Sequence, residues 1–325
     1  MRGGTSVNSG WVQSKQMRTT RARTGQTRTT RGRARRILTK VLVYGTLALG
    51  VLVVLFPLYY LFVSSIRPGN ATMGELWPSK LNWENWKYLF GLQYLDTTTN
   101  QVRQPEFPTL LWLFNSVKVS SITAFLTVCL ATTGAYALSR FRFAGRRFGI
   151  VALLFLQLFP SVMSMVALYL MLDFIGQYIP WLGLNTHGGL ILVYLGGVPF
   201  QMWLMKGYFD TMPKDMEEAA QIDGCNRWQA FYRVLLPLSV PIIAVVAILV
   251  FVGTFSDFLL PSVIIRDQDK LTYAVGLRTL GGSGFGVRWG VFSAGGLLGG
   301  IPIAAFFLLA QRYLISGLAR GGVKG

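Results

Sequence analysis

Six long apolar stretches constrain the fold of this chain more than any other feature. They cover residues 37–63, 115–138, 149–172, 188–205, 238–265 and 289–314. A helix needs about 20 mostly apolar residues to cross the hydrocarbon core of a bilayer, and each of these stretches approaches or exceeds that length. Pro160 and Pro199 are expected to bend the third and fourth helices. The sequence therefore predicts an all-α integral membrane protein with six transmembrane helices.

The overall composition agrees with this prediction. Hydrophobic residues make up 52% of the 325 residues and charged residues only 14%, against about 25% charged in ordinary soluble domains. The first apolar stretch does not have the pattern of a cleaved signal peptide, because the basic region before it and the apolar run itself are both too long. We expect this span to remain part of the protein.

The net charge of +18 is concentrated at the N-terminus. Residues 1–36 hold ten of the 31 Lys and Arg residues and no Asp or Glu, and they have no apolar periodicity. This pattern predicts a disordered basic tail that stays on the cytoplasmic side and contacts anionic membrane lipid. An RNA-binding arm is the alternative, and we disfavour it because no aromatic residue is interleaved with the basic residues after Trp11. We therefore expect no nucleic-acid partner.

The distribution of Lys and Arg along the chain predicts the orientation in the membrane. If both termini are inside, the internal segments hold 21 of the 31 basic residues and the external loops hold eight. The turn between the second and third spans contributes four cations and no acid: Arg140, Arg142, Arg146 and Arg147. Because cytoplasmic loops are enriched in Lys and Arg, we predict that both termini lie in the cytoplasm. The polar stretch between the fourth and fifth spans then lies there too.

That polar stretch, residues 211–241, begins with a short predicted helix. Thr211 and Pro213 are helix start signals, and the acidic residues that follow suit the positive end of a helix dipole. Gly224 stands where a helix commonly ends with one residue in the left-handed conformation, which glycine adopts without strain. We predict a sharp corner at this glycine.

A second short helix is predicted after the corner. Asn226 is a good N-cap, and Gln229 follows three residues later as in a capping box. Pro237 is expected to close this helix. Four apolar residues fall on one face at i, i+3, i+4 and i+7: Trp228, Phe231, Tyr232 and Leu235. A helix, a glycine corner and a second helix between two membrane spans form a shape that is suited to docking on a protein outside the membrane.

The sequence offers no catalytic site. It contains no phosphate-binding loop, and Cys129, Cys225 and the single His187 form no cluster with metal-ligand spacing. His187 is expected in a loop. A chain of six spans without such chemistry indicates a transport passage rather than an enzyme.

Asp257 and Gln157 are candidate pathway residues. An ionisable group inside a membrane span is a functional hypothesis by default. A hydrogen-bonded or wetted carboxylate explains Asp257 equally well, and Gln157 and Asn115 could bind sugar hydroxyls or simply join helices.

The same polar stretch carries a long and specific motif. Glu218, Ala219 and Ala220 are followed by Gly224 and, ten residues later, by Val234, with Leu236 and Pro237 after it. This pattern resembles the Glu-Ala-Ala loop of ABC importer permeases, with Val234 where the family usually has Ile. Further segments resemble the second permease subunit of maltose/maltodextrin importers: residues 115–119, 183–189, 206–209, 235–241, 309–312 and 321–325. The resemblance covers about residues 37–325.

This resemblance implies a fold and an assembly. The fold is that of a type I ABC importer permease, with the permease domain at residues 37–325 and a cytoplasmic coupling loop at residues 206–237. The partners are a second permease subunit, two ATPase subunits that bind ATP and Mg, and an external sugar-binding protein. The chain itself needs no cofactor and is expected to be a multi-pass protein of the bacterial cytoplasmic (inner) membrane.

The resemblance also implies two sets of site residues. The ATPase-coupling residues are Glu217, Glu218, Ala219, Ala220, Asp223, Gly224, Leu236 and Pro237, with Glu218 as the polar contact. The loop that meets the binding protein is Gly281, Gly282, Ser283, Gly284, Phe285 and Gly286, and the segment 321–325 resembles a tail that contacts the ATPases.

Maltose or maltodextrin is the implied substrate, and trehalose or another oligosaccharide is the alternative. We disfavour a secondary transporter that works alone, because the sequence has no internal repeat and scarcely any charge within its spans.

Overall fold

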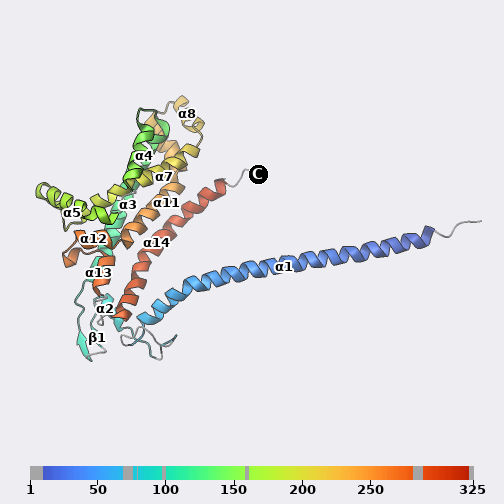
Figure 1. Cartoon of the computed structure of the whole chain (residues 1–325), viewed down its shortest axis with the longest axis horizontal. Coiled ribbons are helices and arrows are strands. Elements are labelled where there is room, and N and C mark those ends of the chain that lie inside the picture. The colour runs from blue at the N-terminus through green and yellow to red at the C-terminus, as the bar shows by residue number, and fades with distance from the viewer. Residues whose placement is uncertain are drawn as a thin grey trace, which may run out of the picture. The chain divides into compact units, whose positions relative to one another are not determined.

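The computed structural model describes residues 10–68, 76–78, 80–96, 100–157, 161–280 and 288–321 (Figure 1). It divides into two compact units, residues 1–60 and 61–325. The described residues are almost entirely helical. The one sheet found among them is a hairpin in which β1 (Tyr94–Asp96) pairs antiparallel with β2 (Gln101–Arg103). This confirms the predicted fold class at the level of an all-helical protein.

The described part of the first unit belongs to one long helix, α1 (Gly10–Ser65), whose last residues belong to the second unit. Its part from Leu38 to Ser65 is 28 residues long and apolar enough to cross a membrane. The helix also includes residues 10–36, which the sequence alone predicts to be disordered. These residues contain no proline, and Arg and Gln are favourable helix formers that can extend a helix already nucleated by the apolar segment.

Within the part of the chain that the structure describes, four helices are long and apolar enough to span a membrane, and a bent pair brings the number to five. Besides the segment in α1 they are α3 (Thr109–Arg140), the run from α6 (His187–Tyr194) through α7 (Val198–Thr211), and α14 (Trp289–Gly321). The bent pair comprises residues 227–238 and α11 (Val240–Ser256), which meet at an angle of 74°. A short 3-10 turn at Leu195–Gly197 interrupts the fourth span just before Pro199, as expected of a proline at a helix start.

The third predicted span is not one helix. The chain forms α4 (Arg146–Leu156) and α5 (Ser161–Tyr178), which run in different directions in Figure 1. Pro160, where a kink was predicted, lies outside the described residues. A proline lacks the N–H that would continue the helical ladder and its ring crowds the preceding turn, so prolines commonly kink or end helices.

The fifth predicted span, residues 238–265, is also broken. α11 ends at Ser256, and a separate short helix, α12 (Leu259–Ile264), follows. The backbone of Asp257 is extended, and its carboxylate accepts the N–H of Leu259 at 2.9 Å. Aspartate side chains compete for backbone donors in this way and favour helix ends over helix interiors. The prediction of one continuous helix here is therefore wrong.

Helix α3 is the centre of the second unit. It packs against α7 and α11, and α11 packs in turn against α14. Two buried clusters lie along α3. One surrounds Trp112 near its start, and the other contains Ala135, Tyr136, Phe209 and Phe231 near its end. A single rigid helix thus joins the two ends of the bundle.

Side chains near the start of α3 bind the segment that connects α12 to α13 (Tyr273–Leu280). The Trp112 Nε1–H donates to the Gln268 carbonyl at 2.6 Å, and the Asn115 amide donates to the carbonyls of Asp269 and Leu271 at 2.9 and 3.1 Å. Of the two roles left open for Asn115, the structure supports the structural one. The short helix α2 (Glu84–Leu89) packs on α14 at the same end of the bundle.

His187 is the first residue of α6, although the sequence suggests a loop. Its Nε2 lies 2.8 Å from the Lys270 carbonyl oxygen. Thr186, just before it, caps the helix by accepting the Gly189 N–H at 3.0 Å. This local start signal accounts for the position of the helix boundary.

Candidate functional site

The predicted helix and glycine corner are present. α8 (Asp215–Ile222) carries three acidic residues in its first turn. After it, the Gly224 N–H donates to the Gln221 carbonyl at 3.1 Å, and the Cys225 N–H donates to the Ala220 carbonyl at 2.9 Å. These two bonds form a Schellman motif, and Gly224 has φ of +89°. A side chain at this position would be strained by the backbone alone, since no atom lies within 4 Å of where its Cβ would stand.

The second helix has the predicted cap but a different end. The Asn226 side chain accepts the Gln229 N–H, and the Gln229 side chain accepts the Asn226 N–H, both at 2.8 Å. The helix then continues as α9 (Arg227–Ala230), a π-helical turn (Phe231–Leu235) and α10 (Leu236–Leu238). It therefore passes through Pro237, where the sequence predicted its end. A π turn is a known way in which the helical ladder accommodates an interruption.

The predicted apolar face of this helix is half buried and half exposed. Phe231 and Leu235 are buried, and the Phe231 ring lies 4.5 Å, centroid to centroid, from the Tyr136 ring of α3. Trp228 and Tyr232 are exposed. The inner half of this face packs against α3, and the outer half is exposed.

A buried ion pair ties α8 to the end of α3. The Arg140 Nε lies 2.6 Å from Glu217 Oε1, and only 8% and 7% of the two side chains are exposed. Arg140 also donates to the Phe209 carbonyl at 3.0 Å and to the Ser139 hydroxyl at 3.1 Å. The guanidinium therefore joins α3, the end of α7 and α8 at one point.

In the sequence, Arg140 is only one of the four cations that predict the orientation in the membrane. Its partner Glu217 is 77 residues away, so no local spacing reveals the pair. A further contact of the same kind is the Tyr136 hydroxyl, which donates to the Arg227 carbonyl at 3.1 Å. Both residues lie on the last turns of α3, and both hold the element that follows α7.

The opposite side of α8 faces outward. Glu218 and Ala219 are exposed, and Ala220 is half-buried. Ile222 is 87% exposed and Met216 is 44% exposed. Asp223 and Gly224 are exposed at the corner, whereas Leu236 and Pro237 lie farther on, in α10. The structure thus presents an acidic and apolar surface on a helix whose inner side is fixed.

The two candidate pathway residues have different surroundings. Asp257 lines a cavity of about 380 Å³ together with Thr127, Gln201 and Thr254, and its carboxylate accepts the Tyr194 hydroxyl at 2.9 Å. Gln157 follows the last turn of α4, is exposed, and lies with its amide nitrogen 3.5 Å from the Gly196 carbonyl. It is not among the residues that line this cavity. The structure therefore does not bring Asp257 and Gln157 together.

The predicted binding-protein loop, Gly281 to Gly286, lies outside the described residues, as does most of the C-terminal segment 321–325. Helix α14 contains two overlapping Gly-x-x-x-Gly pairs, Gly295 with Gly299 and Gly296 with Gly300. Side-chain atoms of Leu277 and Tyr273 on α13 stand where the Cβ atoms of Gly295 and Gly299 would be, whereas Gly296 and Gly300 meet nothing within 4 Å. One of the two pairs is thus used for packing inside the chain.

Comparison with known proteins places these features in a family. The family model described as "Binding-protein-dependent transport system inner membrane component" matches residues 128–320, which include α8, its corner and the second helix. The maltose/maltodextrin transport system permease protein MalG of Salmonella typhimurium is 48% identical over 273 residues, covering 84% of this chain and 91% of the relative. The protein of the same name from Escherichia coli strain K12 is 45% identical over 294 residues, covering 90% and 97%.

A solved structure shares the fold. It is that of a bacterial ABC transporter involved in the import of the acidic polysaccharide alginate. The matched chain superposes with a TM-score of 0.66 at 21% identity, over 85% of this chain and 96% of that chain. The predicted ABC importer permease fold is thereby confirmed.

Proposed function

Because this chain belongs to the family of binding-protein-dependent transport system inner membrane components, we propose that it forms part of the passage of an ATP-driven importer for maltose and maltodextrin. It is a multi-pass transport component of the inner membrane and not an enzyme. Identity of 45–48% over most of the chain to two maltose/maltodextrin permeases supports the substrate. Trehalose or another oligosaccharide remains the alternative substrate.

A binding-protein-dependent ABC component works with ATPase subunits, a binding protein and another permease. We propose the specific assembly of one heterodimer with a second permease, two ATPase subunits that hold ATP and Mg, and an external sugar-binding protein. We also propose six spans with both termini in the cytoplasm, on the strength of the Lys and Arg distribution.

The proposed coupling element is α8 with its corner. The observation that carries this proposal is the different burial of two adjacent glutamates. Glu217 is held inside by Arg140, whereas Glu218 points into an exposed surface with Ala219 and Ile222. Small side chains at Ala219 and Ala220 allow a second protein to approach the backbone closely. We infer that the outer face seats on an ATPase subunit, with Glu218 as its polar contact.

Mechanical continuity supports this role. Shifting a two-state equilibrium from 1:99 to 99:1 needs about 5.5 kcal/mol of differential binding. A helix on a flexible tether could not pass that free energy on to the spans. Here the Glu217 to Arg140 ion pair fixes α8 to α3, and the second helix leads through Leu236 and Pro237 into α11. ATP-driven closure of the ATPases would then tip α3 and α11 together between inward-facing and outward-facing states.

Asp257 and Gln157 remain candidates for the pathway. Asp257 carries the stronger case, because its cavity contains several polar side chains and its carboxylate already binds one hydroxyl, that of Tyr194. Carboxylate oxygens accept hydrogen bonds only, and a sugar presents many hydroxyl donors.

The test is reconstitution in vesicles. We expect uptake of radiolabelled maltose only when this chain, the second permease, the ATPases, the binding protein and ATP are all present. Uptake by this chain alone would contradict the proposal in favour of a secondary transporter. Competition by unlabelled maltodextrin but not by trehalose would support the substrate assignment, and the reverse preference would replace it.

A further inference from the structure

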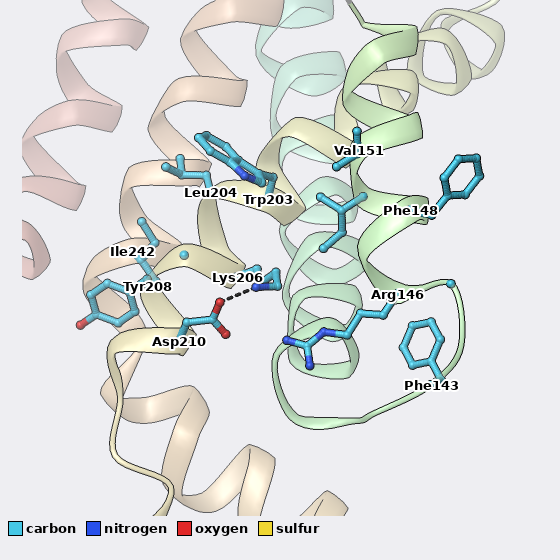
Figure 2. A pocket seen from close by; sticks show the side chains of 13 residues that line it. Phe143, Arg146, Phe148, Val151, Trp203, Leu204, Lys206, Tyr208, Asp210 and Ile242 are labelled. Atoms are coloured by element: carbon cyan, nitrogen blue, oxygen red, sulfur yellow. Dashed lines mark hydrogen bonds and ion pairs between the residues drawn. The ribbon is translucent and has the colours of Figure 1, made fainter.

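A groove of about 1150 Å³ lies between α4, α7 and the beginning of α11, close to the end of the bundle that carries α8 (Figure 2). Its walls are mostly apolar and include Val151, Trp203, Leu204 and Ile242. Trp203 is 46% exposed and Phe148 at the rim is 78% exposed, so the groove is open to its surroundings. In an inner-membrane protein, such an opening at a span end faces lipid or another protein.

The groove changes from apolar to charged along its length. Figure 2 shows Val151, Trp203 and Leu204 toward one end, and Arg146, Lys206 and Asp210 toward the other. The charged end is the one beside the turn between α3 and α4, where the spans leave the membrane. This order of polarity is that of a phospholipid, with a charged headgroup at the membrane surface and apolar chains deeper.

The charges at this end do not cancel. Lys206 pairs with Asp210, which also accepts the Ser139 hydroxyl at 2.6 Å. The Arg146 guanidinium donates to two backbone carbonyls, those of Phe141 at 3.3 Å and Ser139 at 3.5 Å. The lining residues therefore bring two cations against one carboxylate, and Arg146 is held in place by neutral groups. One positive charge remains for an anion.

We propose that the groove binds a membrane phospholipid with an anionic headgroup. Its phosphate would contact Arg146 and Lys206, and an acyl chain would lie along Trp203, Val151 and Ile242. Guanidinium and ammonium groups are good phosphate partners, and basic pockets between transmembrane helices are suited to anionic headgroups. Of the proposed function, this proposal depends only on the location of the chain in the membrane. It does not depend on the docking role of α8.

The site has a structural consequence for the bundle. Few side chains fill the space between α4 and α7, and α7 leads directly into the loop that carries α8. A bound lipid would fill this gap and hold the end of α7 at a fixed distance from α4. Binding would therefore stabilise the membrane side of the proposed coupling element.

The test measures lipid retained by the complete complex. The complex is extracted from membranes that contain both phosphatidylglycerol and phosphatidylcholine, and the lipids that remain bound are counted by native mass spectrometry. We expect retained phosphatidylglycerol in the unaltered protein and at least a fivefold loss in Arg146→Gln. The matched control is Arg142→Gln, which removes the same charge from an exposed residue outside the groove and should leave retention unchanged.

A second variant tests the apolar part without removing any contact. Gly207 lines the groove, and a Cβ there would meet no atom within 4 Å. Gly207→Leu should therefore fold, gain helix propensity, and displace the acyl chain. We expect loss of bound lipid with the subunits still assembled. Equal retention in all variants would overturn the proposal, and loss of the second permease from Gly207→Leu with lipid retained would show that a protein covers this groove instead.

Discussion

At the scale of single residues, Glu217 and Glu218 have opposite surroundings although they are adjacent and chemically identical. The Glu217 carboxylate is buried against Arg140, whereas the Glu218 carboxylate is exposed. Breaking a buried ion pair by removing one partner leaves an uncompensated charge and costs about 3–5 kcal/mol. An exposed carboxylate costs almost nothing to neutralise until a partner covers it.

We therefore predict that Glu217→Gln lowers the thermal unfolding midpoint of the purified permease pair, measured without the ATPase subunits, by several degrees, whereas Glu218→Gln leaves it unchanged. Glu218→Gln should instead weaken the affinity for the ATPase subunit about tenfold or more, because removing one partner of an interface charge pair costs about 2–5 kcal/mol. The double change Arg140→Leu with Glu217→Leu should recover part of the lost stability, since apolar residues of similar volume can replace such pairs. Similar midpoints for the two single variants would refute the assignment.

The residue scale also shows what the sequence can predict. The corner at Gly224 and the capping box of Asn226 with Gln229 are confirmed, because each depends on neighbours within a few residues. The Arg140 to Glu217 pair could not be predicted, since it depends on how α3 and α8 pack in space.

At the scale of elements, apolar length predicted where membrane helices occur but not where they break. The stretches that became α3 and α14 are recovered with shifted ends. The third and fifth stretches are equally apolar, yet each is divided into two helices. Hydropathy averages over a window, whereas a helix end is decided by single residues such as Asp257, whose carboxylate accepts a nearby N–H.

This account of the break predicts the effect of two substitutions at Asp257. Asp257→Asn keeps an oxygen that can accept the Leu259 N–H, so most of the maltose uptake in vesicles should remain. Asp257→Leu removes that acceptor and the partner of Tyr194, and uptake should fall at least tenfold. If Asn is as damaging as Leu, the negative charge itself is required and the carboxylate acts directly on transport.

The junction of α2 and β1 at the other end of the bundle should depend on pH. A hydrogen bond from Lys87, with a further bond from the Leu95 N–H, holds the pKa of the Glu84 carboxyl below its ordinary value of 4.5. A carboxyl with a lowered folded-state pKa contributes stability above its unfolded-state pKa and loses it as pH falls through the folded-state pKa.

Hydrogen exchange at the Leu95 amide measures this contribution. After correction for the intrinsic exchange rate, protection should be constant at neutral pH and decrease as the pH falls below about 4.5. Glu84→Gln is the control and should show weaker protection with no such dependence. Protection that is unchanged in acid in the unaltered protein would mean that the carboxylate does not hold the strand.

Across the chain as a whole, the class of protein could be predicted because it depends on patterns along the sequence. Apolar length predicted a membrane protein, and the spacing from Glu218 to Pro237 identified a permease, which the family match confirms. The contacts that hold α8 in place could not be predicted from the sequence. Arg140 and Tyr136 come from the end of α3 and Phe209 from the end of α7, and only the packed bundle brings them to α8 and α9.

We propose that an ATPase subunit meets this chain at the outer face of α8, and site-directed cross-linking tests this contact. Cys129 and Cys225 are first replaced by Ser, and single cysteines are then placed at Ala219 on α8 or at Val102 on β2, which are both exposed and lie at opposite ends of the bundle. In the assembled complex, Ala219→Cys should cross-link to the ATPase subunit and Val102→Cys should not. A cross-link to the ATPase from Val102→Cys, or none from Ala219→Cys in an active complex, would contradict the account.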